Sequence, residues 1–160
     1  MRYFFALLLL GSLPANAQTE DDKIKAPIKA LFDGMRKADT ALMRSAFAPT
    51  AVLQTIVKNK EGQVSVKTEA VNEFIASIAN VKAGALDERI KYDGIKVDAD
   101  LASVWTPYQF YYNSALSHCG VNAFQLVRLN GEWKIQYIID TRRRQGCDGQ
   151  WKPTHIEDKK

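Results

Sequence analysis

The feature that most constrains the fold is the dipeptide Asn130-Gly131, which separates two stretches of alternating apolar and polar residues. The first stretch covers residues 117–129 and the second covers residues 132–141. Asn-Gly between two such stretches is the strongest short-range signal for a β-hairpin with a two-residue turn. The chain therefore contains an antiparallel hairpin near its C-terminal end, in which Leu129 is expected to pair with Glu132.

This turn also fixes an expected register, which assigns every residue of the hairpin to one of two faces. The expected pairs are Phe124 with Tyr137, Asn122 with Ile139, Gly120 with Thr141, and His118 with Arg143. The face of Phe124 carries more large apolar and aromatic groups, so we expect it to lie on the concave side beneath the helices. Neighbours on a strand point to opposite faces, so His118 is expected to face inward and Cys119 outward.

The rest of the chain predicts three helices and several strands. Apolar residues at helical spacing predict a first helix over residues 20–38, Asp39-Thr40 caps a short second helix that ends at Pro49, and Thr68 caps a third. The expected strands cover residues 52–58, 64–66, 86–97 with a bend at 93–94, and 101–112. This order predicts an α+β fold in which three helices pack on one face of a strongly curved antiparallel sheet.

The strand over residues 101–112 completes the candidate site. A four-residue loop at 113–116 would place Trp105 near Phe124, Gln109 near Gly120 and Tyr111 near His118. A one-residue bulge would exchange Tyr111 for Tyr108 or Tyr112. Aromatic walls with a few polar groups suit a small organic ligand. The candidate ligand-binding residues are Trp105, Gln109, Tyr111, His118, Asn122 and Tyr137, with Thr141 on the same surface.

The N-terminal residues 1–17 have the pattern of a signal peptide. Arg2 precedes the apolar run from Phe4 to Leu10, which is too short to span a bilayer, and Ala15-Asn16-Ala17 offers a cleavage site. We expect cleavage after Ala17 and export to the periplasm or the extracellular space; the alternative is an uncleaved anchor. No second long apolar stretch follows, so no membrane insertion is expected after the signal is removed.

Cys119 and Cys147 are the two cysteines. An even count in an oxidising compartment predicts one disulfide. Gln145-Gly146 can turn the chain back so that Cys147 meets the outward-facing Cys119. The alternative is a free nucleophilic Cys119 beside His118.

The formal net charge of +4 is mild and does not favour nucleic acid as a partner. Much of the excess lies in Arg142-Arg143-Arg144 and in the polar tail, residues 150–160, where His155 is given no role. The two histidines are far apart in the sequence, so no metal site is expected, and no motif for a cofactor is present.

The stretches "DGMRKAD", "SHCG", "GEWKI" and "DTRRRQGC" resemble the nuclear transport factor two-like superfamily, in its secreted lumazine-binding and polyketide-cyclase-like branch. The resemblance runs from about Ile24 to Cys147 and implies one domain over residues 18–149. It implies a cone-shaped α+β fold with a pocket at the wide end, and frequent homodimers through the outer face of the sheet. The superfamily holds both enzymes and pure binding modules, so the fold does not decide the function.

Three functions follow as hypotheses. The leading one is an exported domain that binds a small molecule in an aromatic-lined pocket, with no catalysis indicated by the sequence. The second is a cofactor-independent isomerase or hydrolase that uses His118 as general acid or base, with Tyr111 or Asp140 as its partner. The third is a protein-interaction module whose outer sheet face is formed by Val104, Thr106, Tyr108 and Phe110.

Overall fold

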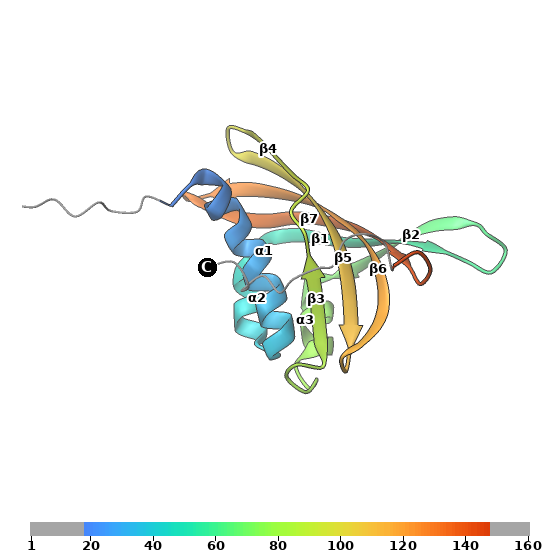
Figure 1. The fold of residues 1–160 in the computed structure, drawn as a ribbon. Coiled ribbons are helices and arrows are strands. Elements are labelled where there is room, and N and C mark those ends of the chain that lie inside the picture. Colours follow the sequence, from blue (N-terminus) through green and yellow to red (C-terminus); the bar gives the residue numbers. More distant parts are fainter. Residues whose placement is uncertain (1–17, 148–160) are drawn as a thin grey trace, which may run out of the picture.

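The computed structural model describes residues 18–147, which form an α+β fold with three helices on one face of a mixed, open sheet of seven strands (Figure 1). The helices are α1 (Glu20–Lys37), α2 (Thr40–Ala46) and α3 (Val71–Ile78). The strands are β1 (Phe47–Lys58), β2 (Val64–Ala70), β3 (Leu86–Ile90), β4 (Gly94–Asp98), β5 (Leu101–Tyr112), β6 (Ala115–Leu129) and β7 (Glu132–Arg143). The predicted signal peptide and most of the predicted tail lie outside the described residues.

The sheet order is β2-β1-β7-β6-β5-β3, and β4 also pairs with β5. All pairs are antiparallel except β1 with β7, which run parallel. The prediction of a purely antiparallel sheet was therefore wrong at this pair, because β1 pairs with its hairpin neighbour β2 on one edge and runs parallel to the last strand, β7, on the other. The predicted bend at residues 93–94 separates β3 from β4, and both pair with β5.

Helix α1 buries the apolar stripe that its sequence predicts. Ile24 and Ile28 are fully buried, and Leu31, Phe32 and Met35 are nearly so. Thr19 caps the helix: its hydroxyl accepts from the backbone N–H of Asp22, and the Asp22 carboxylate accepts from the backbone N–H of Thr19. The stripe holds α1 against the inner face of the sheet.

Gly34 of α1 lets α2 approach closely. A Cβ at this position would lie 2.7 Å from Cγ of Met43, whose side chain is fully buried. Helix α2 begins at its predicted cap, Asp39, but ends at Ala46, before Pro49. Phe47 already belongs to β1, because its pairing with Ile135 of β7 replaces the expected helical turn.

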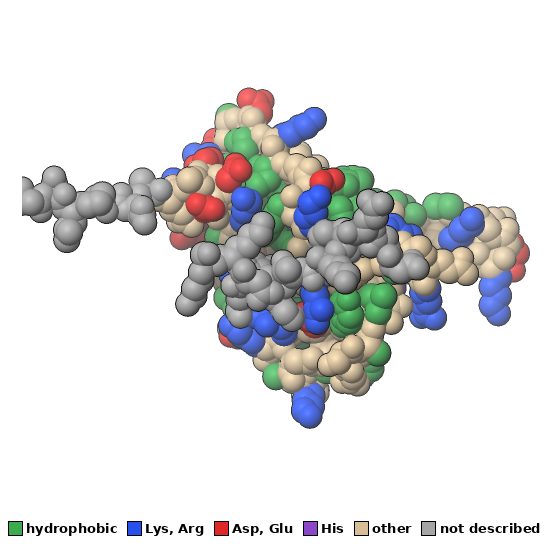
Figure 2. Space-filling model, in the orientation of Figure 1, with side chains coloured by type: hydrophobic (Ala, Val, Ile, Leu, Met, Phe, Trp, Pro, Cys, Tyr) green, Lys and Arg blue, Asp and Glu red, His purple; other side chains and the backbone are tan. Residues whose placement is uncertain are grey.

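Helix α3 begins later than predicted. Thr68 lies in β2 and accepts a hydrogen bond of 3.0 Å from the Gln54 side chain, and the helix starts after Ala70 without a side-chain cap. Pairing with β1 extends β2 to Ala70, so Thr68 is part of the strand and does not cap the helix. The β1–β2 hairpin projects from the sheet, and its basic residues Lys58, Lys60 and Lys67 are exposed there (Figure 1, Figure 2).

The register of β6 and β7 starts as predicted and then shifts by one residue. Leu129 pairs with Glu132 and Leu126 with Ile135, but Gln125 pairs with Tyr137, so Gln136 is an extra residue. Beyond this bulge Phe124 faces Ile138, Asn122 faces Asp140 and Gly120 faces Arg142. The predicted pairs Phe124–Tyr137, Asn122–Ile139, Gly120–Thr141 and His118–Arg143 were therefore wrong. The bulge reverses the faces of β7, so Asp140 points inward and Tyr137 and Thr141 point outward.

The register of β5 and β6 also differs from the prediction. The connection is a two-residue turn, Asn113-Ser114, with φ of 48° and 67°, and not a four-residue loop. A second bulge follows, so that Phe110 pairs with His118 and Tyr111 with Leu116. These two changes reverse the expected faces of β5. Val104, Thr106, Tyr108 and Phe110 point inward, so they do not form the outer face that the third hypothesis required.

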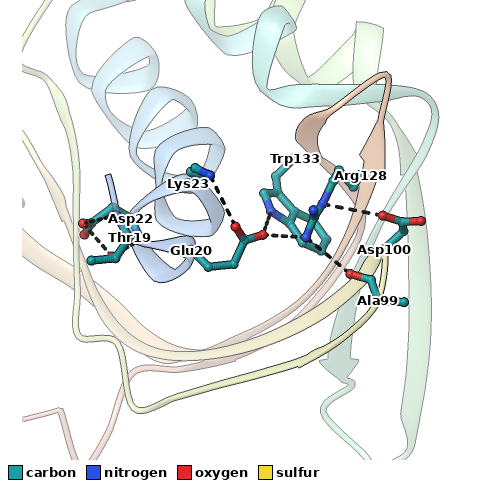
Figure 3. A network of polar contacts seen from close by, with 8 residues as sticks. All are labelled: Thr19, Glu20, Asp22, Lys23, Ala99, Asp100, Arg128 and Trp133. Carbon is teal, nitrogen blue, oxygen red and sulfur yellow. Dashed lines mark hydrogen bonds and ion pairs between the residues drawn. The ribbon is translucent and has the colours of Figure 1, made fainter. Parts of the chain in front are cut away.

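A polar network ties the start of α1 to the β6–β7 end of the sheet (Figure 3). One carboxylate oxygen of Glu20 accepts hydrogen bonds from Arg128, at 2.6 Å, and from the indole N–H of Trp133, at 2.8 Å. The Arg128 guanidinium lies over the Trp133 ring, 4.7 Å from its centroid, and pairs with Asp100 at 3.6 Å. These contacts join α1 to the β6–β7 hairpin, which is distant from it in the sequence, and join the hairpin to the turn between β4 and β5.

Cys119 and Cys147 form a disulfide, as predicted, with a Cα–Cα distance of 5.6 Å. Cys119 lies on the outer face of β6, opposite to His118, as the strand alternation required. The side-chain amide of Gln109 donates to the backbone carbonyl of Cys147 at 2.6 Å. The disulfide and this hydrogen bond hold the segment after β7 against the outer face of the sheet.

No helix within residues 18–147 is both long and apolar enough to cross a membrane.

Candidate functional site

A cavity of about 240 Å³ lies between α1, α3 and the inner face of the sheet. Most of the surface that lines it is apolar. Helices α1 and α3 contribute Leu31, Phe32, Met35, Phe74 and Ile78, and the sheet contributes Leu53, Leu86, Phe110, Phe124 and Ile138. The polar lining residues come mainly from the central strands, so the cavity has apolar walls and one polar wall.

Glu88 and Asn122 form one part of the polar wall. Strand β3 carries Glu88 between Leu86 and Ile90, on the face that alternation turns inward. The side-chain amide of Asn122 donates to a carboxylate oxygen of Glu88 at 2.8 Å. Part of the Glu88 side chain is exposed to solvent, but protein surrounds its carboxyl group. The resulting desolvation raises the pKa of Glu88 to about 7.

Asp140 is the centre of the second part of the polar wall. Its carboxylate is buried and accepts hydrogen bonds from Thr55 at 2.6 Å, Tyr108 at 3.2 Å and Arg142 at 2.8 Å. Arg142 also donates to the Thr55 hydroxyl at 3.1 Å. Burial alone would lower the pKa of Arg142, but the hydrogen bond and charge of Asp140 raise it above its ordinary value. Asp140 and Arg142 therefore form an ion pair in which each charge is matched by the other.

Tyr108 joins β5 to β7 across β6. Its hydroxyl donates to the Thr141 carbonyl at 2.9 Å as well as to Asp140. The residue of β6 that pairs with Tyr108 is Gly120, which has no side chain to block the ring. Burial raises the pKa of Tyr108, so the phenol stays protonated and acts as a donor.

His118 lines the cavity from the end of β6 where Phe110 is its strand partner. Its ring centroid lies 4.8 Å from that of Phe110 and 5.8 Å from that of Tyr108, and its Nδ1 is 3.1 Å from the Ser117 hydroxyl. Burial, followed by the charge of Arg142, lowers the pKa of His118. The imidazole is therefore neutral at neutral pH and able to accept a proton.

The structure brings together three of the predicted site residues: His118, Asn122 and Asp140 all line the cavity. The other four, Trp105, Gln109, Tyr111 and Tyr137, do not line it. They point to the opposite face because the two bulges reverse the expected registers of β5 and β7.

These four side chains have other surroundings. Trp105 is 51% exposed, and the Tyr111 hydroxyl donates to Gln109 at 2.9 Å. The Arg89 guanidinium stacks 4.1 Å from the Tyr111 ring centroid. The Tyr137 hydroxyl donates to the Gln54 side chain at 2.6 Å. Tyr111 and His118, a predicted catalytic pair, therefore lie on opposite faces of the sheet.

The sequence analysis did not place Glu88 or Arg142 in the cavity, and it offered Tyr108 only as the residue that a one-residue bulge would exchange for Tyr111; the structure contains such a bulge, and Tyr108 lines the cavity. A signal for Glu88 was present, because Leu86, Glu88 and Ile90 alternate with polar residues and share one face of a strand. A carboxylate between two apolar residues on the inward face is unusual and marks a candidate site. Within residues 18–147, no group of three or more His, Cys, Asp or Glu side chains is placed to hold a metal ion.

Solved structures with the same fold come from several bacteria. An NTF2-like protein of unknown function from Shewanella baltica OS155 has a TM-score of 0.60, with 18% identity over 78% of this chain and 94% of that one. A protein of unknown function with a cystatin-like fold from Nostoc punctiforme PCC 73102 has a TM-score of 0.61, with 14% identity over 79% and 95%. At these identities the likeness shows the fold alone.

Curated proteins provide no match to this chain. Residues 19–137, well over half of the chain, match the family described as "Putative lumazine-binding". Together with the NTF2-like neighbours, this match confirms the superfamily that the sequence motifs indicated. The chain therefore belongs to the "Putative lumazine-binding" family, within the NTF2-like fold.

Proposed function

We propose that this chain is an exported small-molecule-binding domain whose ligand occupies the cavity between α1, α3 and the sheet. The cavity itself carries the proposal: about 240 Å³ of space with apolar walls and a few convergent polar groups is the kind of site that holds small organic ligands. The description of the family, which names a small heterocycle, supports a binding role.

The test is mass spectrometry of small molecules that co-purify with the protein from its own host. Ile138 lines the cavity, whereas Leu129, at the end of β6, is exposed and does not line it, so Leu129 is the control position. Wild type and Leu129→Phe should retain the same compound, and Ile138→Phe, which fills the cavity, should lose it. Equal retention by both variants would place the ligand elsewhere and contradict the proposal.

A second candidate function, a cofactor-independent isomerase or hydrolase, is supported by His118. This neutral imidazole faces the cavity, where a bound ligand could transfer a proton to it within hydrogen-bond reach. Incubation of the co-purified compound with fresh enzyme should then give a product, and His118→Gln should bind the compound without converting it. Conversion at the wild-type rate by His118→Gln would rule out this role.

The outer face of the sheet supports a homodimer. Trp105, Ala123 and Ile139 are directly paired across β5, β6 and β7, and the neighbouring row contains Pro107 and Val121. This apolar surface is partly exposed. Light scattering should give twice the mass of one chain for wild type and the mass of one chain for Trp105→Lys. Leu129→Lys, at an exposed residue beside the β6–β7 turn, is the control and should remain dimeric.

The disulfide is compatible with export into an oxidising compartment. The intact mass of the protein from its own host should correspond to a chain that begins at Gln18, with two hydrogens fewer than the reduced sequence. A full-length mass with two titratable thiols would contradict both the predicted cleavage and the proposed location.

A further inference from the structure

We propose that the cavity selects an organic cation, a protonated amine on a small aromatic or apolar body, and that Glu88 is its counter-ion. This inference rests on the proposed function and names the ligand class for the same site. It follows from the charges that line the cavity and from the partners that each of them has.

The polar lining has more negative than positive groups. Three carboxylates line the cavity, from Glu69, Glu88 and Asp140, and the one guanidinium is that of Arg142. Arg142 is engaged by Asp140 at 2.8 Å and by Thr55 at 3.1 Å, so its charge is matched within the protein. An anionic ligand would be repelled by the carboxylates that have no cationic partner, whereas a cationic ligand would pair with such a carboxylate.

Asp140 is paired with Arg142 and Glu69 is exposed to solvent, so among the described residues Glu88 is the desolvated carboxylate of the cavity that forms no ion pair. Its polar contact within the described residues is the Asn122 amide at 2.8 Å, which satisfies one oxygen and supplies no charge. Buried charges in proteins are normally paired, because desolvation of an isolated carboxylate is unfavourable. A ligand ammonium at this place would supply the missing charge and use the second carboxylate oxygen in a charge-assisted hydrogen bond.

The walls around Glu88 suit the rest of such a ligand. Phe74, Tyr108, Phe110 and Phe124 line the same cavity and present aromatic rings. Aromatic faces attract organic cations when water is excluded, and they also pack against an apolar body. Phe110 is the direct strand partner of Glu88, so an aromatic ring and the carboxylate are neighbours.

The pH dependence of binding follows from the groups that face Glu88. Asn122 on β6, Asp140 and Arg142 on β7 and Tyr108 on β5 interact with Glu88, and His118 on β6 and Glu69 on β2 line the same cavity; α1 and α3 contribute apolar residues and Ser77. Glu88 has a pKa of about 7, so it loses its proton as the pH rises through neutrality. Amine binding should therefore tighten between pH 6 and pH 8.

The experiment compares three probes of nearly equal shape: tryptamine, which is a cation, tryptophol, which is neutral, and indole-3-acetate, which is an anion. Titration calorimetry should rank tryptamine first and indole-3-acetate last. Glu88→Gln keeps the shape and the hydrogen bond to Asn122, and should weaken tryptamine about tenfold or more, because it removes the charge-assisted bond. The tightening between pH 7 and pH 8, where His118 is already neutral, should disappear in the same variant.

Glu69→Gln is the matched control, because it removes an exposed carboxylate that also lines the cavity. It should change tryptamine binding by less than Glu88→Gln. The cation proposal is overturned if tryptophol or indole-3-acetate binds as tightly as tryptamine, if Glu88→Gln binds tryptamine like wild type, or if none of the probes binds. Retention of a neutral or anionic compound that Ile138→Phe loses would overturn the cation class and leave the proposed binding function intact.

Discussion

Tyr108 and Gly120 are strand partners, and the tyrosine ring occupies the space that a side chain at position 120 would need. A Cβ on Gly120 would lie 2.8 Å from Cε1 of Tyr108 and 1.8 Å from the Thr141 carbonyl oxygen. The absence of a side chain lets Tyr108 cross β6 and donate to Asp140 and to the Thr141 carbonyl of β7. The polar wall of the cavity depends on this close approach.

Gly120→Ala should therefore destabilise the protein and disturb the site together. Overpacking of a well-filled interior typically lowers the free energy of unfolding by about 1–3 kcal/mol. Gly94→Ala is the control, because a Cβ at Gly94 meets nothing within 4 Å. Urea denaturation should show a clear loss for Gly120→Ala and little change for Gly94→Ala. Equal midpoints for the two variants would show that the contact at position 120 is not limiting.

The elements that local patterns encode could be predicted from the sequence. The stripe of Ile24, Ile28 and Leu31 buries one face of α1, and the Asn130-Gly131 turn pairs Leu129 with Glu132. The inward His118 and the outward Cys119 also followed from alternation, because the extra residue of one bulge, Gln136, is in β7 and that of the other, Ser117, precedes His118 in β6. These features depend on neighbouring residues, so the local sequence determines them.

The site was predicted only in part, because it depends on two bulges that no local signal marks. The extra residue Gln136 turns Asp140 inward and Tyr137 outward, and the bulge beside Tyr111 turns Tyr108 inward. A shift of one residue moves a whole set of side chains to the other face. The parallel pairing of β1 with β7 is likewise a tertiary contact between segments far apart in the sequence.

Glu88 makes the stability of the ligand-free protein depend on pH. Its pKa is about 7 in the folded protein, against an ordinary value of 4.5, so the folded state binds this proton more tightly than the unfolded chain. The associated stability is fully present below pH 4.5 and is lost as the pH rises through 7. Glu88→Gln removes this dependence. The free energy of unfolding of wild type, taken relative to that of Glu88→Gln, should therefore fall by up to about 3 kcal/mol between pH 5 and pH 8.

The measurement is urea denaturation of wild type and Glu88→Gln between pH 5 and pH 8. His118 has the opposite sign, because its lowered pKa costs stability as the pH falls, but it is present in both proteins and cancels in their difference. Glu69→Gln controls for the loss of one exposed carboxylate. A difference between wild type and Glu88→Gln that stays constant over this range would show that burial does not perturb Glu88.

The disulfide should contribute strongly to stability. It joins residues 28 positions apart, and closing a loop of that length contributes about 3–4 kcal/mol in the chain-entropy model. The double variant Cys119→Ala/Cys147→Ala should lose that amount in urea denaturation, and wild type measured with a reductant should lose a similar amount. If reduction leaves the wild-type midpoint unchanged, the crosslink does not constrain the unfolded chain in the expected way.

The Glu20 network should hold the first turn of α1 to the sheet (Figure 3). Arg128→Met keeps an apolar stem near Trp133 but removes the hydrogen bond to Glu20 and the pairing with Asp100. Amide hydrogen exchange in the first turn of α1 should then become faster, and the thermal midpoint should fall by a few degrees. Lys23→Met is the control, because its ion pair with Glu20 is longer, at 3.6 Å, and more exposed. Exchange that is no faster in Arg128→Met than in Lys23→Met would mean that the apolar stripe alone anchors the helix.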